Sequence, residues 1–97
     1  MGGRGTPSYL REQVIDRDGL TCQYCGRELV VNAPWPWYPT LDHVIPKAQG
    51  GETVYENLVV SCQPCNQKKR DRTPLEAGMR LLCELYYDTG ELAGEAG

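Results

Sequence analysis

The stretch "LDHVIPKAQGGETVYENLVVSCQPCNQKK", residues 41 to 69, decides how this chain folds. It contains the only histidine, His43, which directly follows an aspartate inside an otherwise apolar run. Two short apolar segments are separated by a Gly-Gly loop, and the second segment leads into a Cys-x-x-Cys pair. This order predicts a β-hairpin with strands over Thr40–Ile45 and Leu58–Ser61, followed by a helix over Asn66–Arg72.

Four of the five cysteines form two close pairs, Cys22 with Cys25 and Cys62 with Cys65. Two such turns can present four thiolates to one ion, which is the ligand set of a structural zinc site. A redox dithiol would need a βαβ context and would leave the second pair unexplained. Iron also accepts four thiolates, so it stays open as an alternative to zinc. The remaining Cys83 is expected to be a small buried residue.

A chain of 97 residues is one small domain, and such domains often need a cross-link or a metal ion. The sequence has no N-terminal apolar leader and no run of eighteen apolar residues, so we expect a cytoplasmic protein without membrane contact. In that compartment, metal-bound thiolates are a better use of paired cysteines than disulfides.

Charge is distributed unevenly along the chain, although the net charge is −3. Residues 63–73 carry four basic side chains against one acidic side chain, whereas residues 84–97 carry four acidic side chains and no basic one. The acidity therefore belongs largely to the C-terminal end, and the middle of the chain can still face nucleic acid.

Further elements are expected on both sides of the hairpin. Thr6-Pro7 begins a helix that stops at Gly19, and Thr73-Pro74-Leu75-Glu76 is a capping box that opens a helix ending near Gly90. The other expected elements are a short strand over Glu28–Asn32, an ordered loop over 33–39, and a disordered acidic tail over 91–97. In the loop, Trp35, Trp37 and Tyr38 are expected to pack on the domain or on a ligand, and packing on the domain is favoured because aromatic residues dominate small cores.

Taken together, these motifs resemble the HNH endonucleases of the His-Me finger (ββα-metal) superfamily. The resemblance rests on the flanking CxxC pairs, on Asp-His followed by an apolar residue and proline, on Asn-Leu before a strand, and on C-x-x-C-N-x-x-K. It implies an α+β fold over residues 1–90: a small zinc-stabilised ββα-metal domain with a short β-hairpin and a helix between two CxxC knuckles, plus an N-terminal and a C-terminal helix. The chain looks like the small free-standing proteins of phage type, in an H-N-N variant.

The resemblance also implies roles for individual residues. His43 matches the general base, Asp42 the ligand of a catalytic divalent ion, and Asn57 the central asparagine, whose amide would join the loop to the strand that carries His43. Asn66 stands where the family most often has histidine. Because an amide oxygen is a harder ligand than imidazole, Asn66 favours Mg²⁺ or Mn²⁺.

The implied reaction is hydrolysis of a DNA phosphodiester, giving a 5′-phosphate and a 3′-hydroxyl. An imidazole titrates near neutrality and can take a proton from water. Basic residues after the second CxxC pair are expected to contact phosphates, with Lys69 and Arg70 on the helix face of Asn66. Lys68 and Arg72 are flanking candidates. A monomer or weak homodimer would nick one strand at a time, and a larger phage or restriction protein is a further expected partner.

Other interpretations compete with this one. A lone histidine in an apolar run is often a satisfied core residue. The chain could also be a zinc-stabilised nucleic-acid-binding module, or an accessory subunit without its own catalysis. Neighbouring side chains on a regular strand point to opposite faces, so Asp42 and His43 can serve one site only if the strand ends or twists there.

Overall fold

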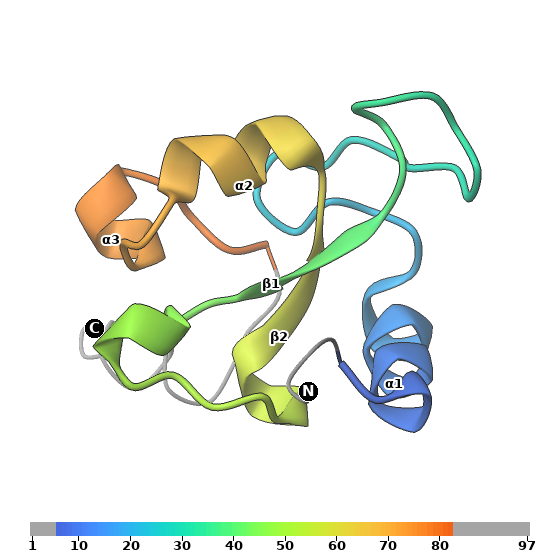
Figure 1. Ribbon diagram of the computed structural model, residues 1–97. Coiled ribbons are helices and arrows are strands. Elements are labelled where there is room, and N and C mark those ends of the chain that lie inside the picture. The colour runs from blue at the N-terminus through green and yellow to red at the C-terminus, as the bar shows by residue number, and fades with distance from the viewer. Residues whose placement is uncertain (1–5, 83–97) are drawn as a thin grey trace.

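The computed structural model describes residues 6–82 and has an α+β fold (Figure 1). None of the helices in this range is long and apolar enough to cross a membrane. In chain order the elements are α1 (Ser8–Asp18), β1 (Thr40–His43), η1 (Lys47–Gln49), η2 (Tyr55–Asn57), β2 (Leu58–Ser61), α2 (Gln63–Lys69) and α3 (Pro74–Ala77).

The predicted hairpin is present as an antiparallel pair of four-residue strands, β1 and β2. Asp42 lies opposite Val59, and His43 lies opposite Leu58. Directly opposed residues share a face of the sheet, and successive residues alternate between faces. The side chain of Asp42 therefore leaves the hairpin on one face and that of His43 on the other. β1 ends at His43, two residues earlier than expected, and the chain bends immediately afterwards.

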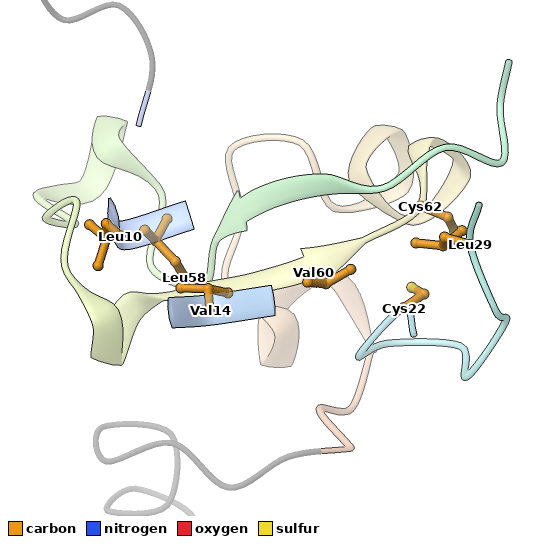
Figure 2. Close-up of a cluster of buried hydrophobic side chains, with 7 residues drawn as sticks. All are labelled: Leu10, Val14, Cys22, Leu29, Leu58, Val60 and Cys62. Atoms are coloured by element: carbon orange, nitrogen blue, oxygen red, sulfur yellow. The ribbon is translucent and has the colours of Figure 1, made fainter. Parts of the chain in front are cut away.

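The main core lies between α1 and the Leu58 face of the hairpin (Figure 2). Leu10 and Val14, one helical turn apart on α1, pack against Leu58 and Val60 of β2. Burial of each such side chain contributes about 1.5–3 kcal/mol. Cys22, Leu29 and Cys62 extend the same cluster toward the cysteine pairs. The core that holds α1 in place thus continues into the candidate metal centre.

The C-terminal end of α1 is fixed to the edge of β2 by polar contacts. The Asp18 carboxylate accepts a hydrogen bond from the Val60 amide at 3.0 Å and pairs with Arg17. Arg17 also donates to the main-chain oxygens of Tyr55 and Leu58. Gly19 then ends the helix with a φ of 71°, a conformation that glycine adopts at little cost. The helix stops at the glycine that the sequence indicated, but its predicted start is wrong, because α1 begins at Ser8 with Pro7 in the N-cap position instead of Thr6.

The predicted strand over Glu28–Asn32 is absent. Glu28 makes a single bridge to Thr21, and Asn32 has a left-handed φ of 68° that turns the chain. Leu29 packs into the main core, but Val30 and Val31 are exposed and no strand of residues 6–82 pairs along this segment.

The helix after the second CxxC pair differs from its predicted bounds of Asn66–Arg72. It begins earlier, at Gln63, because Pro64 in its first turn suits a helix start. It ends at Lys69, since Arg70 has a left-handed φ of 58°. The Arg72 guanidinium donates to the main-chain oxygens of Lys68 and Lys69 and so satisfies carbonyl groups at the helix end.

The predicted capping box of α3 is present, with Thr73 and Glu76 bonded reciprocally. The predicted length of this helix is wrong, because Gly78 adopts a left-handed φ of 71° and α3 stops at Ala77. The predicted helix end near Gly90, the burial of Cys83 and the tail over 91–97 lie outside the described residues.

Residues 33–39 form a loop, as expected from their prolines, and the Trp35–Pro36 peptide bond is cis. Trp37 packs against the main core, and Arg27 stacks on its ring at 3.7 Å. The Tyr38 hydroxyl accepts a hydrogen bond from Gln63. Trp35 is 60% exposed, so the prediction that it packs on the domain is wrong.

Candidate functional site

The four paired cysteines converge on one point. The ligand sulfurs of Cys22, Cys25, Cys62 and Cys65 all lie within 4.8 Å of one another. The Cys25 and Cys62 sulfurs are 3.8 Å apart. A tetrahedral site with Zn–S bonds of 2.3 Å has sulfur–sulfur edges of about 3.8 Å, so the cluster has the dimensions of a zinc centre. Cys62 follows β2 and Cys65 lies in α2, which places this cluster where hairpin and helix join.

The cysteine cluster is electrostatically suited to a cation. Burial raises the pKa of Cys62 to about 11, and the nearby sulfur of Cys22 adds to the effect. Burial also acts to raise the pKa of Cys22, but main-chain N–H donors from Cys25, Cys62 and Tyr24 outweigh it and lower that pKa to about 7. Four thiolates cannot be held together without a positive charge between them, and a divalent ion supplies that charge.

Asp42 of β1 is a buried acid, with 8% of its surface exposed. Its Oδ2 accepts a hydrogen bond from the Tyr24 hydroxyl at 2.7 Å and lies 3.3 Å from the Lys69 ammonium. Within residues 6–82, no donor is bonded to its Oδ1. Burial raises the pKa of Asp42, although the Tyr24 hydroxyl and the charge of Lys69 act in the opposite direction. A carboxylate in this setting gains stability from a further cation at its open oxygen.

Helix α2 is tied to β1 at two points. The side-chain amide of Asn66 donates to Thr40 Oγ1 at 3.0 Å, and one turn later Lys69 reaches Asp42. Thr40 and Asp42 share a face of the hairpin, so that face is the one turned toward α2. The Asn66 side-chain nitrogen is used in this bond, and its Oδ1 accepts no hydrogen bond from the described residues. Asn66 and Asp42 each keep one hard oxygen available, which fits an ion such as Mg²⁺ or Mn²⁺.

Lys69 lies inside the protein, fully buried at 0% exposure. Its ammonium donates to the main-chain oxygen of His43 at 2.7 Å, in addition to its pairing with Asp42. The sequence predicted Lys69 on the DNA-facing surface beside Arg70. The structure places it differently because its side chain reaches back under the strand end, where two acceptors repay the burial of its charge.

His43 is partly buried at the end of β1, and its Nε2 lies 2.8 Å from Thr53 Oγ1. If Nε2 donates to this hydroxyl, Nδ1 carries the lone pair and can act as a base. Burial lowers the pKa of His43, and the positive charge of Lys47 lowers it further, against the opposing effect of Asp42. The imidazole is therefore neutral at neutral pH, which is the form that accepts a proton.

Asn57 joins the loop to the strand end, as the sequence predicted. Its Oδ1 accepts from the Ile45 amide at 2.8 Å, and its Nδ2 donates to the main-chain oxygens of Ile45 and Glu52. Its side chain is buried. Gly51 lies against the same carbonyl, since a Cβ there would be 1.7 Å from the Ile45 oxygen. Asn57 and Gly51 thereby fix the bend that follows His43. A contribution of Asn57 to catalysis stays a prediction.

Of the other predicted phosphate contacts, Lys68 and Arg70 are exposed and Arg72 is exposed but bonded to the end of α2. Lys47, four residues after His43, is a further exposed base, and its charge acts on His43.

Sequence patterns did not indicate Tyr24 or Thr53 as site residues. Tyr24 lies inside the first CxxC turn, and its position there indicates no role beyond separating two predicted ligands. Thr53 lies ten residues after His43 in an irregular loop, and no spacing rule connects the two. Only the folded chain brings each of them to its partner.

A protein-family model described as HNH endonuclease matches residues 22–72, just over half of the 97 residues. The match begins at Cys22 and ends at Arg72, so it spans both cysteine pairs, the hairpin and α2. No curated protein matches the sequence.

Proposed function

This chain belongs to the HNH endonuclease family, and we propose that it is a metal-dependent endonuclease that hydrolyses phosphodiester bonds in DNA. One observation carries the proposal. Asp42 and Asn66 each leave one oxygen without a protein donor in the described range, and Thr53 engages Nε2 of His43, the residue that directly follows Asp42. Two oxygens open to a hard cation, with a neutral imidazole at the next position of β1, supply the ligands and the base that metal-assisted hydrolysis needs.

His43 is the proposed general base. Thr53 holds the ring through Nε2, so Nδ1 takes the proton from the attacking water. Because Asn57 and Gly51 fix the bend after β1, the imidazole keeps its direction while the substrate binds. The partial exposure of His43 gives water access to it.

Asp42 and Asn66 would hold a divalent ion through their Oδ1 atoms, and Mg²⁺ or Mn²⁺ suits this pair of oxygen ligands best. A bound ion of this kind supplies charge compensation at the phosphate and at the leaving 3′ oxygen. The side chains of Asp42 and His43 leave opposite faces of the hairpin. Lys69 binds both the Asp42 carboxylate and the His43 main-chain oxygen from inside the domain, and so fixes the position of one residue relative to the other.

Zinc is the proposed structural ion, bound by Cys22, Cys25, Cys62 and Cys65. Without it the thiols would have to stay largely protonated, because burial raises the pKa of both Cys62 and Cys65. Since Cys65 directly precedes Asn66, the zinc centre also sets where that ligand stands.

The exposed bases Lys47, Lys68 and Arg70 are the proposed phosphate contacts, with Arg72 at the edge of the same surface. Few residues beyond the motif remain to read bases, so we expect weak sequence preference. One active site per chain cuts one strand at a time, and a monomer should therefore nick DNA and leave a 5′-phosphate and a 3′-hydroxyl.

The experiment that tests the proposal is incubation of supercoiled plasmid with the purified protein and Mg²⁺ or Mn²⁺, with an EDTA arm. We expect open-circular product that depends on the added ion, and nicks that DNA ligase reseals directly because they carry a 5′-phosphate. Binding of the plasmid without nicking at any concentration of either ion would instead favour a non-catalytic DNA-binding module.

A further inference from the structure

Tyr24 connects the first CxxC turn to the buried aspartate. It lies between Cys22 and Cys25, and its hydroxyl donates to Asp42 Oδ2 at 2.7 Å, a short distance typical of a hydrogen bond to a charged carboxylate. Its half-buried ring packs against both apolar clusters of the domain, so the ring has little freedom to move. A hydroxyl held this firmly defines where its acceptor can stand.

We propose that Tyr24 is a positioning residue that presents Asp42 Oδ1 to the divalent ion, an inference that rests on the proposed nuclease function. The Tyr24 hydroxyl and the Lys69 ammonium are both directed at Oδ2. The second oxygen of the same carboxylate is thereby turned away from protein donors in residues 6–82 and stays open for the ion.

The hydroxyl contributes something that the ammonium cannot. Lys69 carries a point charge on a flexible four-carbon stem at 3.3 Å from Oδ2, and such a charge attracts the carboxylate without fixing its plane. The phenol has only two side-chain torsions and approaches 0.6 Å closer, at 2.7 Å. Removing the hydroxyl should therefore loosen the orientation of Asp42 while leaving its charge partner in place.

Each CxxC turn then positions one ligand of the divalent ion proposed at Asp42 and Asn66. Asn66 follows Cys65 of the second turn and supplies a ligand oxygen, and Tyr24 inside the first turn orients the other ligand. The zinc centre thus acts as the common support of both Asp42 and Asn66, rather than only as a cross-link for a small fold.

The test compares Mn²⁺ binding to the full-length, zinc-loaded wild type and to Tyr24→Phe, measured by electron paramagnetic resonance of the free ion. Tyr9→Phe on the exposed face of α1 is the matched control, since it removes the same hydroxyl far from the site. We expect the dissociation constant for Mn²⁺ to rise about tenfold in Tyr24→Phe and to stay unchanged in Tyr9→Phe. The Mn²⁺ concentration for half-maximal nicking should rise by the same factor, with the rate at saturating Mn²⁺ within about threefold of wild type.

A third variant separates orientation from packing. Tyr24→p-aminophenylalanine restores an N–H donor at the ring position of the hydroxyl, and we expect it to recover most of the lost Mn²⁺ affinity. The inference is overturned if Tyr24→Phe binds Mn²⁺ like wild type, if the donor-bearing variant is as weak as Tyr24→Phe, or if Tyr24→Phe loses its zinc. A wild type that binds Mn²⁺ but never nicks DNA would instead contradict the proposed function.

Discussion

The ammonium of Lys69 donates to the main-chain oxygen of His43 at 2.7 Å, although Lys69 is a buried residue. The Lys69 ammonium therefore holds the main chain of His43, the proposed base, and it also pairs with the carboxylate of Asp42 at 3.3 Å. Loss of one member of a buried ion pair leaves the other without compensation, which costs about 3–5 kcal/mol. Lys69 is thus expected to act on stability and site geometry rather than on DNA affinity.

Replacing Lys69 by methionine should lower the free energy of unfolding by about 3 kcal/mol, because Asp42 loses its ion-pair partner and keeps only the Tyr24 hydroxyl as a donor among residues 6–82. Urea unfolding of the zinc-loaded protein measures this change. The matched variant Arg70→Met alters an exposed base at the adjacent position and should change stability by less than about 0.5 kcal/mol.

In DNA binding, Arg70→Met should have the larger effect of the two variants, whereas Lys69→Met has the larger effect on stability. Arg70→Met is expected to reduce the slope of log K against log salt concentration by about one, as for loss of one phosphate contact. Lys69→Met should leave that slope unchanged. A reduced slope for Lys69→Met with full stability would show that Lys69 faces the DNA after all.

Thr53 should control the direction of the His43 ring, since its hydroxyl lies 2.8 Å from Nε2. Thr53→Val keeps the branched shape and removes the hydrogen bond, so we expect single-turnover nicking to slow about tenfold, the equivalent of about 1.4 kcal/mol. Thr53→Ser retains the hydroxyl and should stay close to wild type. If valine and serine behave alike, Thr53 does not orient the base.

The pH dependence of nicking should report the environment of His43. Its pKa lies below the ordinary value of 6.5, chiefly because of burial and then because of Lys47. Protonation removes the base, so the rate should fall as pH drops through a midpoint below 6.5. Lys47→Gln removes a positive charge, raises the pKa of His43 and should move this midpoint to higher pH.

Rates measured between about pH 5 and 8 at saturating Mn²⁺ test this, with the remote exposed base changed in Arg11→Gln as control. An acid limb at or above 6.5 in the wild type, or a midpoint in Lys47→Gln that moves downward, would contradict the assignment.

The two adjacent glycines of the loop should differ sharply in their tolerance of alanine. At Gly50 a Cβ meets no atom within 4 Å, and the cost of about 1 kcal/mol comes from its left-handed φ of 92°. At Gly51 a Cβ would overlap the Ile45 carbonyl and approach Asn57 Nδ2 to 2.9 Å. Gly51→Ala should therefore be destabilising by at least about 2 kcal/mol more in urea unfolding. Equal costs would show that the bend after His43 is not fixed as described.

The features that sequence predicted well are local in origin. The α1 stop at Gly19, the Thr73 capping box and β2 each follow from residues within a few positions of one another. The metal-binding cysteines could also be predicted, because two thiolates of one site must come from a short turn and the Cys-x-x-Cys spacing provides that turn.

The wrong predictions concern segments whose structure depends on tertiary contacts. Val30 and Val31 have the propensity for a strand, but no strand pairs with them in residues 6–82, and the helix that follows Thr73 is ended after one turn by Gly78. Helical spacing grouped Lys69 with Arg70, yet Arg70 leaves the helix and Lys69 turns inward. No sequence rule indicates that Lys69 finds two acceptors at the end of β1, the Asp42 carboxylate and the His43 main-chain oxygen.

The most direct test of the central claim is the rate at which supercoiled plasmid is nicked by the wild type and by His43→Ala, at saturating Mn²⁺ and equal zinc content. We expect the wild type to nick the plasmid and His43→Ala to lower the single-turnover rate by at least about a hundredfold, the lower range for a lost general base. Equal rates in the two zinc-loaded proteins would contradict the assignment of His43 as the base.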